Sequence, residues 1–389
     1  GKKSVLLFTS FGIAGLFAVL RDWFTKIPQT WFSKGMMKYG SVGGFYISPM
    51  LVAIGYIVGP LFIGVWFLGA VVGDFGILIF GQKFGFFTLQ QATDIKQSLG
   101  LGMMVGTGIG ILIKGILPNL KKIFGAMFSK ENTGDSILPM RWAPIFLILL
   151  VFVLTYVCNL GIIASVITII GVWLTTSMSS QCVGQSGINP MEIFGIFVLL
   201  VVKTISSIGQ NEALFVAAIV AIACGLTGDV MNDFKAGHIL KTNAKAQWIA
   251  EVIGGFIGAI VSVFVFYFML KAYGGNAFND GTFAAAQAHA VSAMITGISN
   301  YPVFMFGLVA AAILYCLKLP VMTFGLGVYL PFYLSATAFI GGALRFIVDK
   351  FLPNFEKESK GQIIASGVLG GEGVVGVVIA IIVAVKAIA

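Results

Sequence analysis

Apolar runs of about 20 residues recur from one end of the 389-residue chain to the other. A helical run of this length crosses the hydrocarbon core of a bilayer, about 30 Å, because each residue rises about 1.5 Å. Charged residues make up only 10% of the chain, whereas soluble domains carry about 25%. So little charge cannot cover a surface that faces water. The sequence therefore predicts an all-α polytopic membrane protein.

The apolar runs predict about twelve or thirteen transmembrane or re-entrant helices. We expect them at 4–20, 43–59, 60–80, 98–117, 142–158, 160–179, 193–209, 213–228, 248–271, 301–318, 321–345 and 362–388. A shorter segment, 284–298, holds a Gln and a His among small residues. This composition is typical of a re-entrant or broken helix.

Two polar stretches separate apolar runs in the first half of the chain. Residues 21–40 combine basic side chains with Trp and Phe, a composition typical of a linker in the membrane interface. Residues 118–141 are rich in Lys and predict a polar basic linker, which the positive-inside rule places in the cytoplasm. The net charge of +9 is spread over short loops, so we expect no nucleic-acid partner.

An internal repeat is indicated by glycines that recur at fixed spacing. Residues 101–109 align without gaps to 366–374, and at an offset of 273 Tyr56 matches Tyr329 and Trp66 matches Phe339. Two copies of a helical unit are a common sign of transporter architecture, although chance similarity between Gly-rich helices is the alternative. The glycines that match are Gly102, Gly106 and Gly108 with Gly367, Gly371 and Gly373.

The repeat predicts three parts of the chain. Residues 1–117 form the C-terminal part of the first repeat half, 118–141 the linker, and 142–389 the second half. Nothing before the first copy corresponds to 142–300, so we expect a missing N-terminal half, either lost from this chain or supplied by a separate one.

The stretch 181–195, QCVGQSGINPMEIFG, interrupts the apolar runs with polar and helix-breaking residues. Pro190 suits the first turn of a helix, and Asn189 before it is a good N-cap. The helix that follows would point its positive end at the break and receive a carboxylate or another anion, with Glu192 in its first turn. We expect a discontinuous helix that faces a substrate cavity, the alternative being an ordinary turn outside the membrane.

Ionisable residues inside apolar runs are functional candidates, because a charge in the bilayer is costly unless it is paired or lines a cavity. Lys203 lies in one apolar run, and Asn211 and Glu212 begin the next; snorkelling and capping are the alternatives. Asp229 and Asp233 lie four residues apart and share one helix face. They could bind a proton or another cation, although a solvated helix end explains them as well.

Glu372 lies deep in the last apolar run, between glycines that allow other backbone or a ligand to approach closely. The matching residue of the first copy is Thr107. An acid in one copy alone suggests a functional asymmetry such as a proton-coupling site, the alternative being a structural hydrogen bond. Glu251 is a further single acid that is either paired or interfacial.

The sequence thus predicts two sets of site residues around a cavity with alternating access. The substrate-binding set is Gln181, Gln185, Asn189, Glu192, Lys203, Asn211 and Tyr329. The proton-coupling set is Glu372, Asp229, Asp233 and Glu212.

No cofactor, metal site or enzyme is expected. The four Cys stand singly, and the two His, at 238 and 289, lie far apart in the sequence. One rival function is an intramembrane aspartyl protease, because Asp74 and Asp229 each follow a Gly, although neither has the full Gly-x-Gly-Asp setting. A second rival is a passive channel or a non-transporting membrane subunit.

Four segments together resemble the oligopeptide transporter family, which includes peptide carriers and yellow-stripe-like metal-chelate carriers. They are GQSGINPMEIFG (184–195), TGDVMNDFKAGHILKTNAKAQ (227–247), GLGVYLPFYLS (325–335) and ASGVLGGEGVVGV (365–377). The second and fourth segments are the most specific. The resemblance implies a proton-coupled secondary-active importer of small peptides or metal chelates, with about sixteen spans in two related halves.

The resemblance also implies an integral membrane protein, which we place in a bacterial inner (plasma) membrane. Its partners would be the substrate, protons and lipid, with a homo-oligomer as a further possibility. Family members run well beyond 389 residues, so whether this chain alone holds a complete pathway is an open question.

Overall fold

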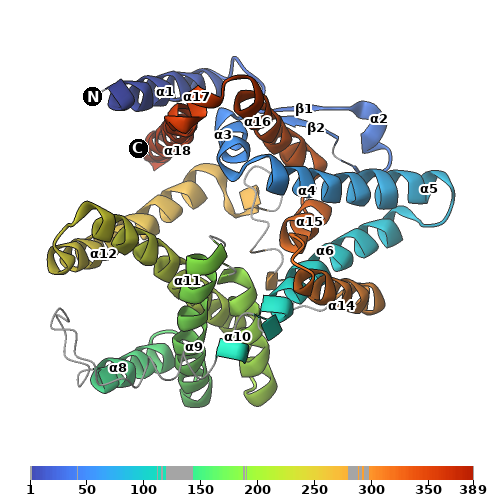
Figure 1. The fold of residues 1–389 in the computed structure, drawn as a ribbon. Coiled ribbons are helices and arrows are strands. Elements are labelled where there is room, and N and C mark those ends of the chain that lie inside the picture. The colour runs from blue at the N-terminus through green and yellow to red at the C-terminus, as the bar shows by residue number, and fades with distance from the viewer. Residues whose placement is uncertain are drawn as a thin grey trace. The chain divides into compact units, whose positions relative to one another are not determined.

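The computed structural model describes residues 2–41, 43–111, 113–114, 117–119, 143–186, 189, 191–278, 288, 291–292 and 298–388 (Figure 1). The chain divides into two compact units. Unit 1 holds residues 1–107, 262–284 and 299–389, and unit 2 holds 108–261 and 285–298. Each unit is described by itself.

Unit 1 consists of helices joined by short connections and one small hairpin. Its helices are α1 (Lys2–Ala18), α2 (Lys34–Met37), α3 (Pro49–Val58), α4 (Pro60–Ala70), α5 (Gly81–Lys83), most of α6 (Leu89–Ile111), α14 (Tyr301–Cys316), α15 (Val321–Tyr329), α16 (Phe332–Phe351), α17 (Pro353–Lys357) and α18 (Lys360–Ile388). Two π-helical segments, η1 (Val19–Trp23) and η2 (Val71–Phe80), continue α1 and α4, and a 3-10 turn, η6, covers Gly275–Phe278.

Unit 2 is a cluster of helices in which α9 packs against α8, α10 and α11. The helices are α8 (Ala143–Tyr156), α9 (Ile162–Ser186), α10 (Met191–Ile205), α11 (Gln210–Leu240) and the first part of α12 (Ala244–Tyr273). A 3-10 turn, η4, covers Leu117–Asn119.

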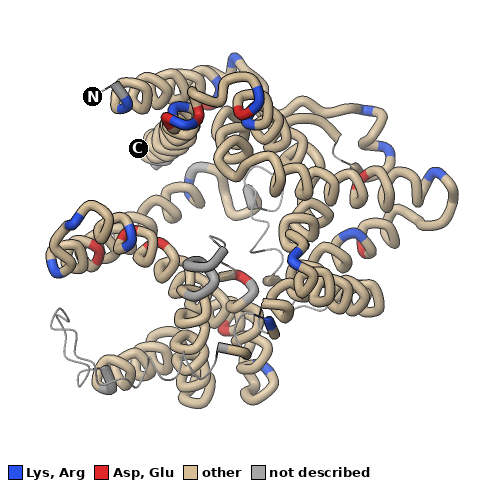
Figure 2. Tube along the Cα trace, viewed as in Figure 1, with Lys and Arg blue, Asp and Glu red and all other residues tan. Residues whose placement is uncertain are grey.

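The predicted class, an all-α polytopic membrane protein, is confirmed. Within the described ranges, seven helices are long and apolar enough to cross a membrane, and four shorter apolar helices accompany them. Basic and acidic residues gather mainly at helix ends and connections (Figure 2), as a bilayer requires. The seven long helices are Lys3–Trp23, Pro60–Lys83, Ile162–Ser180, Gln210–Leu240, Ala244–Lys271, Phe332–Phe351 and Lys360–Val383.

Several predicted boundaries were wrong. The predicted helix 43–59 begins with strand β2 (Gly44–Tyr46), which pairs antiparallel with β1 (Thr30–Phe32) inside the predicted linker 21–40. The predicted helix 321–345 is two helices, because Leu330 and Pro331 adopt extended backbone between α15 and α16. The expected linker 118–141 and re-entrant segment 284–298 lie almost wholly outside the described residues.

Helices α3 and α15 are too short to cross a bilayer. They have 10 and 9 residues, so each is about 15 Å long or less, half of the hydrocarbon core. Each is followed at once by a longer helix, α4 after Gly59 and α16 after Pro331. Unit 1 therefore contains two broken helices of the same design.

The packing of these broken helices repeats itself. A methyl group on Gly55 of α3 would collide with the carbonyl oxygen of Ala338 in α16, and one on Gly327 of α15 would collide with that of Trp66 in α4. Both members of the first contact are 272 residues from their counterparts in the second. The same offset relates Gly341 against the Val52 carbonyl to Gly69 against the Phe324 carbonyl.

A second set of contacts obeys the repeat as well. Gly102 of α6 lies against the Phe304 carbonyl of α14, and Gly367 of α18 lies against the Leu7 carbonyl of α1. The glycine pair is 265 residues apart, as the aligned Gly-rich segments predicted. These contacts support the predicted internal repeat, with α1, α3, α4 and α6 equivalent to α14, α15, α16 and α18. The predicted division at 117 and 142 stays a prediction.

The offset predicted for the broken helices was one residue too large. The contacts relate them by 272 residues and not 273, so Tyr329 is equivalent to Ile57 and not to Tyr56. The sequence alignment paired Tyr56 with Tyr329 because they are identical residues. The repeat preserves instead the close contacts between glycines and backbone carbonyls, which an alignment of side chains does not show.

Gly55→Ala and Gly327→Ala should destabilise the protein to a similar extent, because each added methyl group meets backbone that cannot turn away. We expect the free energy of unfolding to fall by about 1–3 kcal/mol in each variant, as for overpacked cores. Thermal unfolding followed by tryptophan fluorescence in detergent measures it. Gly64→Ala in α4 is the matched control, since nothing lies within 4 Å of its added methyl group. A large effect at Gly55 with none at Gly327 would contradict the repeat.

Candidate functional site

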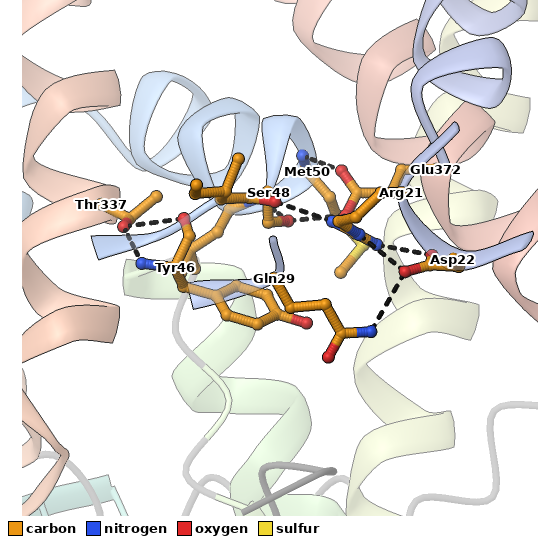
Figure 3. A network of polar contacts seen from close by, with 10 residues as sticks. Arg21, Asp22, Gln29, Tyr46, Ser48, Met50, Thr337 and Glu372 are labelled. Atoms are coloured by element: carbon orange, nitrogen blue, oxygen red, sulfur yellow. Dashed lines mark hydrogen bonds and ion pairs between the residues drawn. The ribbon is translucent and has the colours of Figure 1, made fainter. Parts of the chain in front are cut away.

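The carboxylate of Glu372 is the centre of a buried polar cluster in unit 1 (Figure 3). It lies in α18 and is 4% exposed. One oxygen, Oε1, accepts from Arg21 Nη1 at 2.6 Å and from Ser48 Oγ at 2.8 Å. The other, Oε2, accepts from the Met50 amide at 2.6 Å. Both oxygens are therefore occupied, and Glu372 joins α18 to the N-terminus of α3 and to η1.

Local sequence explains why the N-terminus of α3 meets an acid. Ser48 is the N-cap and accepts from the Leu51 amide, and Pro49 takes the first helical position, where no amide donor is needed. The amide of Met50 would otherwise be an unpaired donor at this end. A negative charge at a helix N-terminus is also favoured by the helix dipole. Glu372 thus completes the cap of α3.

Arg21 connects this cap to the rest of the cluster. Its guanidinium binds both oxygens of Asp22, at 2.7 and 2.8 Å, and donates to the Ile47 carbonyl at 2.9 Å. The π-helical segment η1 places Arg21 and Asp22 at the end of α1. Tyr46 lies under the guanidinium, 5.9 Å from ring centroid to Cζ. Asp22 and Glu372 therefore share one cation in this site.

A second buried ion pair lies in the same unit. Lys96 Nζ of α6 is 2.7 Å from Asp74 Oδ2 of η2 and 3.3 Å from the carbonyl oxygen of Leu330. Asp74 Oδ1 accepts from Ser41 Oγ at 2.7 Å. Asp74 is 1% exposed. Its carboxylate is thus committed to Lys96 and Ser41, which disfavours the aspartyl protease, whose two acids would share a proton.

The position equivalent to Glu372 in the other repeat copy is Thr107. It is buried in α6, and its hydroxyl donates to the Met103 carbonyl of its own helix at 2.8 Å. The Thr107 hydroxyl group thus bonds within its own helix, whereas Glu372 binds groups from α3 and η1. The repeat therefore preserves the packing of its helices but not their charges.

In unit 2 a helix is interrupted where the sequence predicted. Helix α9 ends at Ser186 and α10 begins at Met191, and of the residues between them the structure describes Asn189. The Asn189 amide group donates to the Cys224 carbonyl of α11 at 2.8 Å and accepts from Ser179 Oγ of α9 at 2.7 Å. Asn189 thus connects the break between α9 and α10 to α9 and α11.

The predicted substrate residues of unit 2 lie at two ends of the helix cluster. Glu192 is in the first turn of α10 and Lys203 in the last, so they are about 16 Å apart along the axis. Lys203 lies instead near the start of α11, with Asn211 and Glu212. The backbone of Gln181 and Gln185 belongs to the last turns of α9, on the side of the break.

Tyr329 ends α15 in unit 1, where its Cβ and backbone lie against Gly100 of α6. Tyr329 and Glu372 thus belong to unit 1, and the remaining predicted site residues belong to unit 2. A cavity shared by both sets stays a prediction.

The predicted acidic pair of α11 has a third member. Asp229 and Asp233 are exposed, and Glu251 of α12 adds a third acid close to them. Glu251, left undecided from the sequence, thus has acidic neighbours. Among the residues that the structure describes, no group of three or more His, Cys, Asp or Glu could hold a metal ion.

Sequence reasoning missed Arg21, Lys96 and Ser179. Arg21 was assigned to an interfacial linker because the stretch 21–40 combines basic side chains with Trp and Phe. Lys96 precedes the apolar run 98–117 and carried no signal of its own. Its partner Asp74, inside an apolar run, was the available clue, because a buried acid requires a cation from elsewhere in the chain.

A comparison with protein families matches residues 4–383 to the model described as OPT oligopeptide transporter protein. A protein of Haemophilus influenzae named "Putative oligopeptide transporter" is 27% identical over 201 residues, which cover 44% of this chain and 32% of that protein. The probable metal-nicotianamine transporter YSL11 of Oryza sativa is 25% identical over 169 residues, covering 38% of this chain and 24% of that protein.

The metal-nicotianamine transporter YSL2 of Arabidopsis thaliana is 29% identical over 113 residues, covering 27% of this chain and 16% of that protein. The matches thus span about a third or less of the length of these curated relatives.

Arg21→Met should destabilise the protein strongly, by about 3–5 kcal/mol, because it leaves the buried carboxylates without their cation. Arg21→Met combined with Glu372→Gln should recover much of the loss, since less charge is then left unpaired. Thermal unfolding in detergent measures both. Lys360→Met, which removes the partner of exposed Glu358, is the control and should change nothing measurable. A double variant no better than Arg21→Met would contradict the pairing.

Proposed function

The chain belongs to the oligopeptide transporter family, and we propose that it is a proton-coupled secondary-active transporter of small peptides or metal chelates. These are the substrates that the names of its relatives give: oligopeptides for the bacterial protein and metal-nicotianamine for the plant proteins. A bacterial inner (plasma) membrane is the location that we propose for it.

The observation that carries the proposal is the position of Glu372. A carboxylate in an apolar span, 4% exposed, binds a helix cap, a guanidinium and a hydroxyl from two other elements. Adding a proton would remove the negative charge that holds Arg21 and would turn one acceptor oxygen into a donor. A neutral carboxyl group still accepts hydrogen bonds but binds the Arg21 guanidinium and the Met50 amide more weakly, because the bonds are no longer charge-assisted on the acceptor side. Protonation would therefore loosen α18 from α3 and η1.

Such a contact is a two-state element that a proton biases. Arg21 of η1 bonds Glu372 directly and links it to Asp22, and the Tyr46 ring of β2 lies against the Arg21 guanidinium. Arg21 remains bound to Asp22 when Glu372 is neutral, so the guanidinium is not left without a partner. This arrangement supports a reversible switch, since the buried cation keeps one anion in both states.

The substrate site that we propose is the break between α9 and α10. The positive end of α10 suits a substrate carboxylate, and Glu192 in its first turn suits a substrate ammonium. Asn189 holds the break against α9 and α11 through Ser179 and Cys224, so these groups would be preorganised for binding. Lys203 and Asn211 lie at the other end of α10 and would contact the substrate on entry or exit.

Asp229 and Asp233 are a second place for a proton. Glu251 lies close to both, so three carboxyl groups are brought together, and a proton would relieve the repulsion between them. The exposure of both Asp side chains favours proton exchange with water over storage. We propose that this group relays protons and that Glu372 couples them to movement, with Glu212 at the start of α11 as a further relay.

Glu372→Gln should abolish accumulation of radiolabelled trialanine against a gradient in proteoliposomes with an imposed pH difference. The amide cannot release a proton, so coupling is lost. Exchange between labelled and unlabelled peptide, which needs no net proton movement, should persist. Thr107→Val is the matched control at the equivalent position and should accumulate normally. Gradient-driven uptake by Glu372→Gln would refute the coupling role, and wild-type flux that ignores the pH difference would favour a passive channel.

Glu192→Gln should raise the KM for the same peptide by about tenfold, the effect of one charged hydrogen bond at the break. Lys203→Gln should change KM by less, because it lies at the far end of α10. Initial uptake rates across a range of peptide concentrations give both values. A larger effect at Lys203 than at Glu192 would move the substrate site to that end. Metal-nicotianamine in place of trialanine tests the other substrate class in the same assay.

A further inference from the structure

Lys96 reaches a backbone carbonyl at the end of a broken helix. Its ammonium group lies 2.7 Å from Asp74 and 3.3 Å from the carbonyl oxygen of Leu330. Leu330 is the C-cap of α15, with extended backbone, and Pro331 follows it. The carbonyls in the last turn of a helix have no partner within it. Lys96 provides one of them with a donor, and a cation at a helix C-terminus is also favoured by the helix dipole.

The same helix, α6, contacts the end of α15 a second time. Gly100, one turn after Lys96, lies so close to Tyr329 that an added methyl group would be 2.8 Å from its Cβ. Gly73 of η2 lies against the Val328 carbonyl and beside the Lys96 side chain. The backbone at Val328 and Tyr329 is therefore held by packing against glycines of η2 and α6. The backbone at Leu330 is held by the Lys96 ammonium group.

The two short helices are thus held by opposite charges at opposite ends. Glu372 binds the amide end of α3, and Lys96 binds the carbonyl end of α15. Helices α3 and α15 are equivalent in the repeat, but the charges are not, since Gly361 occupies the position equivalent to Lys96. Each charge has its own counter-ion, Arg21 for Glu372 and Asp74 for Lys96.

A buried ion pair needs a reason beyond stability. Two charges brought out of water lose their hydration, and apolar residues of similar volume often stabilise a fold as well or better. An apolar pair could fill the space of Asp74 and Lys96. It could not donate to the Leu330 carbonyl, which would then have no partner in a low-dielectric setting.

We propose that Lys96, held in place by Asp74, is a positioning residue for transport. It fixes the Leu330 carbonyl and with it the backbone of Tyr329, the residue that the sequence assigned to substrate binding. This inference rests on the proposed transport function for its effect on substrate, but its structural part does not. Asp74 orients the ammonium group, and Ser41 orients Asp74.

Four variants separate positioning from charge balance. Lys96→Met leaves Asp74 buried without a cation and should lower the unfolding temperature, so its results are compared with those of the other three variants. Asp74→Asn combined with Lys96→Met is free of charge and should unfold near the wild-type temperature. Lys96→Arg keeps a donor cation at this position. Asp74→Asn alone keeps the ammonium group but not the group that orients it.

Hydrogen–deuterium exchange of the wild type and the variants in nanodiscs tests the structural part without any substrate. The charge-free double variant should exchange its amides at 327–333 about tenfold faster than the wild type, the effect of one lost charged hydrogen bond. Lys96→Arg should restore most of the protection. Peptides from α3, 49–58, should exchange at the same rate in all variants, because Glu372 holds them. Wild-type protection of 327–333 in the double variant would overturn the proposal.

Uptake of radiolabelled trialanine by the same proteins tests the functional part. The double variant should show a KM raised by about tenfold, with Lys96→Arg close to the wild type. An unchanged KM with faster exchange at 327–333 would overturn the role of Lys96 in transport. If the wild type accumulates neither trialanine nor metal-nicotianamine, the proposed function fails, while the exchange result still decides whether Lys96 holds α15.

Discussion

The bond between the Glu372 carboxylate and the N-terminus of α3 is the interaction on which the arrangement of unit 1 depends. A bilayer offers no water to the free amide of a broken helix, so the protein must supply the acceptor itself. Glu372 supplies it from α18, and Arg21 brings the counter-charge from η1. Under the proposed coupling, a proton on this carboxyl group would weaken the cap of α3. The stability of this helix end and the proposed response to protons would then have the same physical origin.

The repeat sets the framework within which these charges act. Glycine-to-carbonyl contacts between α3 and α16 recur between α15 and α4, and those between α1 and α18 recur between α14 and α6. Such close contacts are the main source of helix association where lipid removes the hydrophobic driving force. The charges break the symmetry, because a carboxylate binds the start of α3 and an ammonium group binds the end of α15. Two equivalent helices can then respond differently to one proton.

How much of this the sequence predicted depended on the range of the interaction. The class, the helix break before Met191 and the position of Glu372 inside an apolar helix followed from local composition, because an acid or an Asn-Pro pair in an apolar run is conspicuous. The break at Leu330 was missed, since its flanking residues are as apolar as the helices. Arg21 and Lys96 were missed because their partners are 351 and 22 residues away. Each lies next to an apolar run, and the neighbouring sequence does not distinguish a buried cation there from one at the membrane surface.

The distance between α3 and α18 as a function of pH is the measurement that tests the central claim most directly. Spin labels on Cys residues at the exposed positions 58 and 374, in a background without the native Cys, report it by pulsed electron paramagnetic resonance. We expect one narrow distance distribution at high pH and a broader or shifted one at low pH, with Glu372→Gln resembling the low-pH state at every pH. A distribution that is the same at both pH values and in Glu372→Gln would contradict the account.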